Sequence, residues 1–171
     1  MSWGCGNGVA AFILAELGYV AHGIDISATA IAWAKETQKF AGVECCFVQG
    51  DVSEMPEYRD GYFQLIFDGA CLHCLIGSRR AKAFREVRRI IAEDGTFVLS
   101  SMCGVPKRPP HGVIYDAEHE LLLRDSTPYR TIRSPANLVS ELEAHGFRAG
   151  KMFIKENPWW DHLTIVARPS A

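Results

Sequence analysis

The stretch Gly4-Cys5-Gly6-Asn7-Gly8, close to the N-terminus, decides how this sequence is interpreted. Three glycines in such a short stretch let the backbone bend tightly and approach a ligand closely, as in a turn between a strand and a helix. The apolar run from Val9 to Leu17 predicts the helix, and Gly18 is placed to end it. The stretch therefore predicts a site for a nucleotide-type cofactor.

Composition limits the class of protein. A chain of 171 residues is long enough for one domain and too short for two ordinary ones, so we expect a single domain over residues 1–171. A hydrophobic content of 48% with 22% charged residues is typical of soluble globular proteins. A net charge of −2 and the lack of a long apolar run favour a cytoplasmic protein with neither nucleic-acid nor membrane partners.

The rest of the chain alternates between predicted strands and helices. Strands are expected over residues 19–26, 43–48, 62–67 and 96–102, with helices over 27–40 and 78–92. A further helix should begin at Ser134-Pro135, followed by two strands, 147–155 and 159–168, joined by a turn at Asn157-Pro158. This order predicts an α/β fold with a Rossmann-like parallel sheet, helices on both faces and an antiparallel C-terminal hairpin. Residues 104–133 interrupt it, and we interpret them as an insertion or lid.

Three chemical signals fall at the ends of successive predicted strands, where open α/β sheets bind ligands. The first is the glycine turn. The second is Asp25, whose carboxylate can accept both hydroxyl protons of a ribose. The third is Gly50-Asp51-Val52, where a carboxylate and a backbone amide could contact an adenine edge. Each alone also fits a turn or a helix cap, but the three in order indicate a nucleoside-containing cofactor.

These motifs resemble those of the class I S-adenosylmethionine-dependent methyltransferases of the small-molecule type, and Phe67-Asp68-Gly69-Ala70-Cys71-Leu72-His73 is similar to the family's fourth-strand segment. The resemblance implies S-adenosyl-L-methionine as cofactor and in-line methyl transfer to a small-molecule acceptor. The glycines would approach the methionine portion, Asp25 the ribose, Asp51 with Val52 the adenine, and Ala70 the methyl donor. The cofactor-binding residues that it implies are Gly4, Cys5, Gly6, Asp25, Ile26, Asp51, Val52, Asp68 and Ala70.

The start of the chain departs from the family pattern, in which a full apolar strand precedes the glycines. Here only Ser2-Trp3 stands between Met1 and Gly4, so we expect a first strand that is mostly missing and a chain truncated at the N-terminus. One alternative is therefore a truncated, inactive domain that keeps the fold without binding cofactor. A second alternative is an NAD(P)-dependent oxidoreductase, because residues 6–11 also fit G-x-G-x-x-A. The Gly50-Asp51 pair and the antiparallel ending argue against it.

His73 is the candidate catalytic residue, since it should lie over the methyl-transfer site and could deprotonate a nucleophile. A local hydrogen bond would explain it equally well. The run Cys71-Leu72-His73-Cys74 could suggest zinc, but one such pair is a weak signal, and we expect buried reduced thiols and no metal. The sequence leaves open the acceptor, the atom methylated and the oligomeric state.

Two further patterns have ordinary structural explanations. The predicted helix over residues 78–92 carries six Lys or Arg residues, which we interpret as a solvated surface. Asn157-Pro158-Trp159-Trp160 is interpreted as a hairpin turn followed by core tryptophans.

Overall fold

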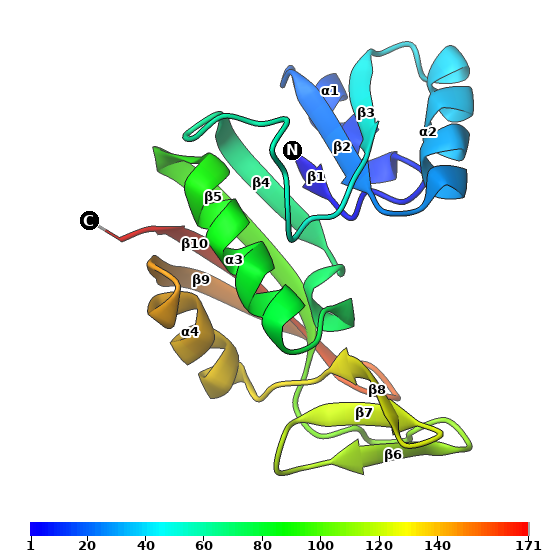
Figure 1. Ribbon diagram of the computed structural model, residues 1–171, viewed down its shortest axis with the longest axis vertical. Coiled ribbons are helices and arrows are strands. Elements are labelled where there is room, and N and C mark those ends of the chain that lie inside the picture. The colour runs from blue at the N-terminus through cyan, green and yellow to red at the C-terminus, as the bar shows by residue number, and fades with distance from the viewer. Residues whose placement is uncertain (171) are drawn as a thin grey trace.

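The computed structural model describes residues 1–170, and a seven-stranded sheet in the order β3-β2-β1-β4-β5-β10-β9 runs through it (Figure 1). The neighbours from β3 to β5 are parallel, whereas β10 is antiparallel to both β5 and β9. The predicted α/β fold with an antiparallel C-terminal hairpin is confirmed. The strands are β1 Ser2–Trp3, β2 Ala21–Asp25, β3 Cys45–Gln49, β4 Phe63–Gly69, β5 Ile91–Cys103, β9 Phe147–Lys155 and β10 Asp161–Pro169.

The first strand has two residues and lies at the centre of the sheet. Ser2 and Trp3 pair with β2 on one side and with β4 on the other. Trp3 is fully buried, and its indole meets the ring of Phe97 edge-on, with centroids 6.1 Å apart. The first strand is thus short, and Trp3 anchors the glycine turn that follows it.

Helices cover both faces of the sheet. They are α1 Val9–Glu16, α2 Ala28–Ala41, α3 Ser78–Ile90 and α4 Pro135–Ala144, with the short 3₁₀ helix η1 Leu72–Cys74. Helices α1 and α2 share an apolar cluster with Phe47 of β3 on one face. Helices α3 and α4 pack on the other face, in front of β5 and β9 in Figure 1. Among residues 1–170, no helix combines the length and apolar character needed to cross a membrane.

Two helices begin where the sequence predicts. The Ser27 hydroxyl accepts a hydrogen bond from the backbone N–H of Ala30 at 3.2 Å and caps α2. The Ser134 hydroxyl caps α4 in the same way, accepting from Asn137 N–H at 3.1 Å, and Pro135 occupies the first helical turn. These caps fix the ends of the helices that pack against the sheet.

Residues 104–133 contain a small antiparallel sheet, which the sequence analysis did not predict. Its strands are β6 Val113–Asp116, β7 Leu121–Arg124 and β8 Thr127–Thr131, in the order β6-β7-β8 (Figure 1). The Thr131 hydroxyl donates to the carbonyl oxygen of Leu75 at 3.0 Å. This hydrogen bond ties the small sheet to the segment that follows η1.

The interpretation of the basic residues of α3 as solvated is wrong at one position. Arg80 is only 3% exposed, and its guanidinium donates to both carboxylate oxygens of Glu141 at 2.7 Å. It also donates to the carbonyl oxygen of Leu72 at 2.7 Å. Arg80 therefore joins α3 to α4 and to η1 rather than facing solvent.

Two other expectations about burial are corrected. Trp159 is half-exposed rather than a core residue, because it lies in the turn between β9 and β10. All six cysteines are free thiols, as expected, but Cys46 and Cys74 are exposed rather than buried.

Candidate functional site

The glycine turn is held in place by Asp25. The Asp25 carboxylate accepts hydrogen bonds from Gly6 N–H at 2.8 Å and from Ser27 N–H at 2.9 Å, one on each oxygen. Gly4 has a φ of 64°, and a Cβ at that position would lie 2.5 Å from the Cβ of Cys71. Conformation and space both require glycine at Gly4. At Gly6, with a φ of 53°, a Cβ would meet nothing within 4 Å, so the backbone there borders open space.

A cavity of about 190 Å³ opens beside this turn and is called the Asp25 cavity. Its walls include five of the predicted cofactor-binding residues: Gly4, Asp25, Ile26, Asp51 and Val52. Gly50, Cys71, Cys74, Leu75 and Arg79 complete the lining. The structure thus brings together, from the ends of β1, β2 and β3, the three signals that the sequence places far apart.

Asp51 is engaged on both carboxylate oxygens. One oxygen accepts from the backbone and hydroxyl of Ser53 at 2.9 and 2.8 Å, and the other accepts from the Arg79 guanidinium at 2.6 Å. Burial opposes ionisation, but these hydrogen bonds and the positive charge of Arg79 outweigh it and lower the pKa of Asp51. Asp51 therefore remains a carboxylate at neutral pH.

A second cavity of about 460 Å³, called the His73 cavity, lies between η1 and the small sheet. Its lining residues are Ala70, His73, Cys74, Met102, Pro110, Leu122, Arg124, Tyr129, Arg130, Trp160 and His162. Cys74 also lines the Asp25 cavity, so the two cavities share a wall at the end of η1. Ala70 is held in the left-handed region at a φ of 77°, which is a strained conformation for a residue with a Cβ.

The two histidines of the His73 cavity are neutral at physiological pH. His73 is 7% exposed, and its buried Nδ1 atom has no hydrogen-bond partner among residues 1–170. Burial, followed by the positive charge of Arg130, lowers the pKa of His73 to about 3. Burial also lowers the pKa of His162, whose Nε2 atom accepts from the indole N–H of Trp160 at 3.3 Å.

Three predicted residues lie outside the walls of both cavities. Gly6 forms the turn itself, and Cys5 is a buried thiol whose pKa is raised to about 12, by burial first and then by the nearby Asp25 charge. Asp68 is fully buried and accepts from Cys71 N–H at 2.6 Å and from Leu72 N–H at 3.3 Å. Burial raises the pKa of Asp68 to about 7 although these hydrogen bonds oppose it. Asp68 thus holds the start of η1 rather than facing a ligand space.

Sequence reasoning missed several wall residues. Arg79 was grouped with a basic helix, and Leu75 follows η1 without any motif of its own. The acidic strand ends identify part of the lining of the Asp25 cavity, whereas the rest comes from η1 with its flanking residues and from the first turn of α3. Leu122 and Trp160 are brought to the His73 cavity only by tertiary folding.

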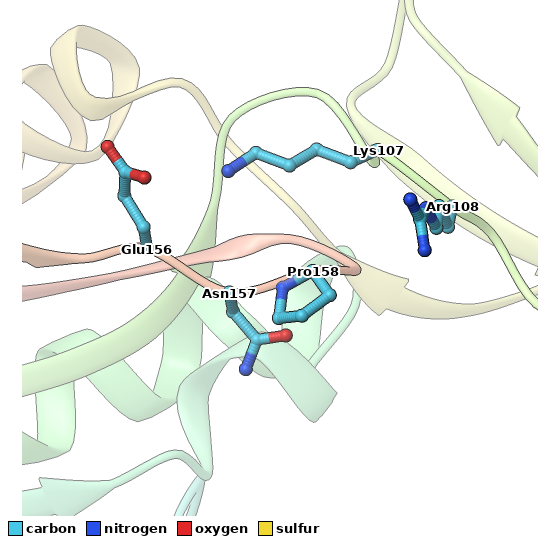
Figure 2. A pocket seen from close by; sticks show the side chains of 5 residues that line it. All are labelled: Lys107, Arg108, Glu156, Asn157 and Pro158. Atoms are coloured by element: carbon cyan, nitrogen blue, oxygen red, sulfur yellow. The ribbon is translucent and has the colours of Figure 1, made fainter.

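A third cavity, of about 540 Å³, lies elsewhere, at the turn between β9 and β10. Figure 2 shows Lys107 and Arg108 on one side of it, and Glu156, Asn157 and Pro158 on the other. It contains none of the predicted site residues, and Lys107 is already paired with Asp161 at 2.6 Å. Its size alone therefore does not make it the functional site.

The described residues, 1–170, contain no group of three or more His, Cys, Asp or Glu side chains arranged to hold a metal ion. The thiols of Cys71 and Cys74 have a raised pKa, in both cases chiefly because of burial. They are therefore protonated, which disfavours them as nucleophiles.

Comparisons with known proteins identify the fold and the family. An uncharacterized methyltransferase of Schizosaccharomyces pombe is 31% identical over 96 residues, which cover 56% of this chain and 66% of that protein's length. A solved structure from Pyrococcus horikoshii superposes with a TM-score of 0.80 at 21% identity, covering 99% of this chain and 80% of the other. The 1,6-didemethyltoxoflavin-N1-methyltransferase of Burkholderia thailandensis, solved with 1,6-didemethyltoxoflavin and S-adenosylhomocysteine, superposes with a TM-score of 0.78 at 20% identity, covering 99% of this chain and 70% of that one.

At these identities the solved structures show a shared fold. Neither an NAD(P)-dependent oxidoreductase nor an inactive domain is favoured by them. The family model described as a methyltransferase domain matches residues 1–99, which is more than half of the chain. The chain belongs to this family, the class I S-adenosylmethionine-dependent methyltransferases.

Proposed function

We propose that this protein transfers a methyl group from S-adenosylmethionine to a small-molecule acceptor that binds in the His73 cavity. The observation that carries the proposal is the shared wall at Cys74, which places a cofactor-type cavity beside a cavity lined by polar and aromatic side chains. Ligand sites in open α/β sheets lie at this edge, beyond the carboxyl ends of the parallel strands.

The residues of the Asp25 cavity fit the cofactor. Each Asp25 oxygen already accepts one backbone hydrogen bond and keeps a free lone pair for a ribose hydroxyl. Ile26, which is 60% exposed, and Val52 offer apolar surface to a flat adenine ring. The open space above Gly6 leaves room for the backbone to approach the methionine portion. When bound, S-adenosylmethionine supplies an electrophilic methyl group on a positively charged sulfur.

The chemistry asked of the second cavity is modest. The bound cofactor would supply its methyl group to a lone pair of the acceptor, the electrons of the carbon–sulfur bond would return to sulfur, and the proton that the acceptor loses would pass to solvent. With its pKa lowered to about 3, His73 is a neutral imidazole that orients the acceptor through a hydrogen bond and is a poor base on its own. Holding the two partners in line supplies about 7–11 kcal/mol of the barrier in favourable cases.

The insertion would act as a lid within one domain. Leu122, Arg124, Tyr129 and Arg130, from β7 and β8, supply one wall of the His73 cavity. Such a wall excludes water from the methyl-transfer site and admits the acceptor when it moves.

Titration calorimetry with S-adenosylhomocysteine and, in parallel, NADH tests the proposal. We expect S-adenosylhomocysteine to bind and NADH not to bind. Asp25→Ala should weaken binding by about tenfold or more, because charge-assisted hydrogen bonds to the ribose are lost. His73→Ala should change it little, since His73 lines only the acceptor cavity. A larger loss of binding in His73→Ala than in Asp25→Ala would show that the ribose does not bind at Asp25. A folded protein that binds no S-adenosylhomocysteine would refute the proposal.

A further inference from the structure

We infer that the acceptor is a planar aromatic molecule that carries a carboxylate, which the guanidinium of Arg130 binds with support from Arg124. This inference names the substrate class of the His73 cavity and so rests on the proposed function.

The charges that face the cavity are all positive. Its lining includes two arginines and, within the described chain, no aspartate or glutamate. Neither Arg124 nor Arg130 forms an ion pair with any residue in the range 1–170. Arginines that border a cavity without an acidic partner favour an anionic ligand, because the guanidinium fork matches a carboxylate.

The side chain of Tyr129 gathers the two guanidinium groups. The Cζ atom of Arg124 lies 5.0 Å from the centre of the Tyr129 ring, and that of Arg130 lies 5.4 Å from it. Arg130 also donates from Nη1 to the carbonyl oxygen of Tyr129 at 2.9 Å. These contacts hold Arg130 at the cavity wall while the rest of its donors have no protein partner among residues 1–170.

The remaining walls fit a flat ring. Met102 and Leu122 are buried apolar side chains, and Trp160 adds an aromatic surface. The indole N–H of Trp160 is used by His162, so the indole has no donor to offer a ligand.

The buried imidazole of His73 adds a polar group to the wall of the same cavity. It is 7% exposed, it lines the cavity, and its Nδ1 atom lacks a partner in the described structure. Buried polar atoms are usually hydrogen-bonded, and this one is an exception that no residue in the range 1–170 satisfies. The neutral ring can hydrogen-bond the acceptor's nucleophilic group while Arg130 holds the carboxylate.

The test compares acids with amides of the same shape. Benzoate with benzamide, and nicotinate with nicotinamide, are titrated into the protein saturated with S-adenosylhomocysteine. Binding is followed by the indole N–H resonance of Trp160, assigned with Trp160→Phe. We expect each acid to bind about tenfold or more tightly than its amide. The preference should be lost in Arg130→Gln, partly restored in Arg130→Lys, and unchanged in Arg85→Gln, a matched exposed arginine on α3.

Equal binding of acid and amide overturns the inference, as does a preference that survives in Arg130→Gln, or no binding of either acid. Saturation with S-adenosylhomocysteine is verified first in the same sample. If S-adenosylhomocysteine does not bind, that result counts against the proposed function. The acids and amides are then compared in the absence of S-adenosylhomocysteine. Saturation followed by equal binding of acid and amide counts against the anionic acceptor alone.

Discussion

Arg80 should be one of the most costly side chains to remove. Arg80→Met keeps much of the apolar stem but leaves the Glu141 carboxylate, 13% exposed in the native protein, without its bidentate partner. Breaking one side of a buried ion pair costs about 3–5 kcal/mol, because the remaining charge is desolvated and uncompensated. Arg133 lies close to Glu141, with Nε 3.1 Å from Oε2 but without hydrogen-bond geometry, so it compensates only in part. We therefore expect a loss near the lower limit, about 3 kcal/mol.

Urea unfolding of matched variants measures this loss. The control is Arg88→Met, on the same helix, whose partner Glu93 is 79% exposed at the side chain. Exposed pairs of this kind contribute about 0–1 kcal/mol. For a chain of this size, 3 kcal/mol corresponds to a fall in Tm of about 6–12 °C. The double variant Arg80→Met, Glu141→Met should recover part of the loss, since no buried charge is then left alone.

The reasoning fails if Arg80→Met costs no more than Arg88→Met. It also fails if the double variant is as unstable as the sum of its two single changes, because the cost would then come from lost packing.

Three other outcomes are expected. Gly4→Ala should reduce the affinity for S-adenosylhomocysteine by more than tenfold in calorimetry. A left-handed non-glycine residue costs about 1–2 kcal/mol, and the added Cβ would clash with Cys71. Unchanged affinity would place the cofactor elsewhere. Arg79→Met should tighten the binding of S-adenosylhomocysteine by about threefold, since Arg79 competes for the Asp51 oxygen that adenine would use. Weaker binding in this variant would show that Arg79 contacts the ligand. The Asp68 contribution to stability should fall as pH rises from about 4 to about 7, because folded Asp68, with its pKa raised to about 7, keeps a proton that the unfolded chain has already lost. Buried His73, with its pKa lowered to about 3, acts in the opposite direction, so the fall is measured as the difference between the pH profiles of the unsubstituted protein and of Asp68→Asn. The contribution is at most about 4 kcal/mol, and urea unfolding of Asp68→Asn should lack this fall; equal pH profiles would contradict the assignment.

The parallel sheet and its antiparallel C-terminal hairpin could be predicted from the sequence because local signals agree with the fold. Ser27 and Ser134 each mark a helix start through a cap that involves only nearby residues. Asp25 and Asp51 end parallel strands, and parallel strands must bring their carboxyl ends to one edge. Predictions that depend on local chemistry plus this topological rule were therefore reliable.

The small sheet could not be predicted in this way. Its turns place Glu120, Asp125 and Ser126 in the left-handed region, and none of these positions has the glycine that would indicate a turn in the sequence. Its strands are only four or five residues long, too short for a clear alternating pattern.

The burial of Arg80 could not be predicted from the sequence for a different reason. Its partner Glu141 is 61 residues away in the chain, and no local pattern separates one arginine of a basic helix from the next. Only the packing of α3 against α4 decides which one leaves solvent. The composition of the helix thus gives the wrong environment for the residue that matters most to its packing.

In the lid role proposed for residues 104–133, the hydrogen bond from Thr131 to Leu75 would have a kinetic consequence. Leu75 lines the Asp25 cavity, whereas Thr131 ends the strand that carries Arg130. Raising the small sheet would pull on the backbone that forms a wall of the neighbouring cavity. Departure of the methylated product would then loosen the grip on the spent cofactor, so that one slow opening step would set the turnover rate for both.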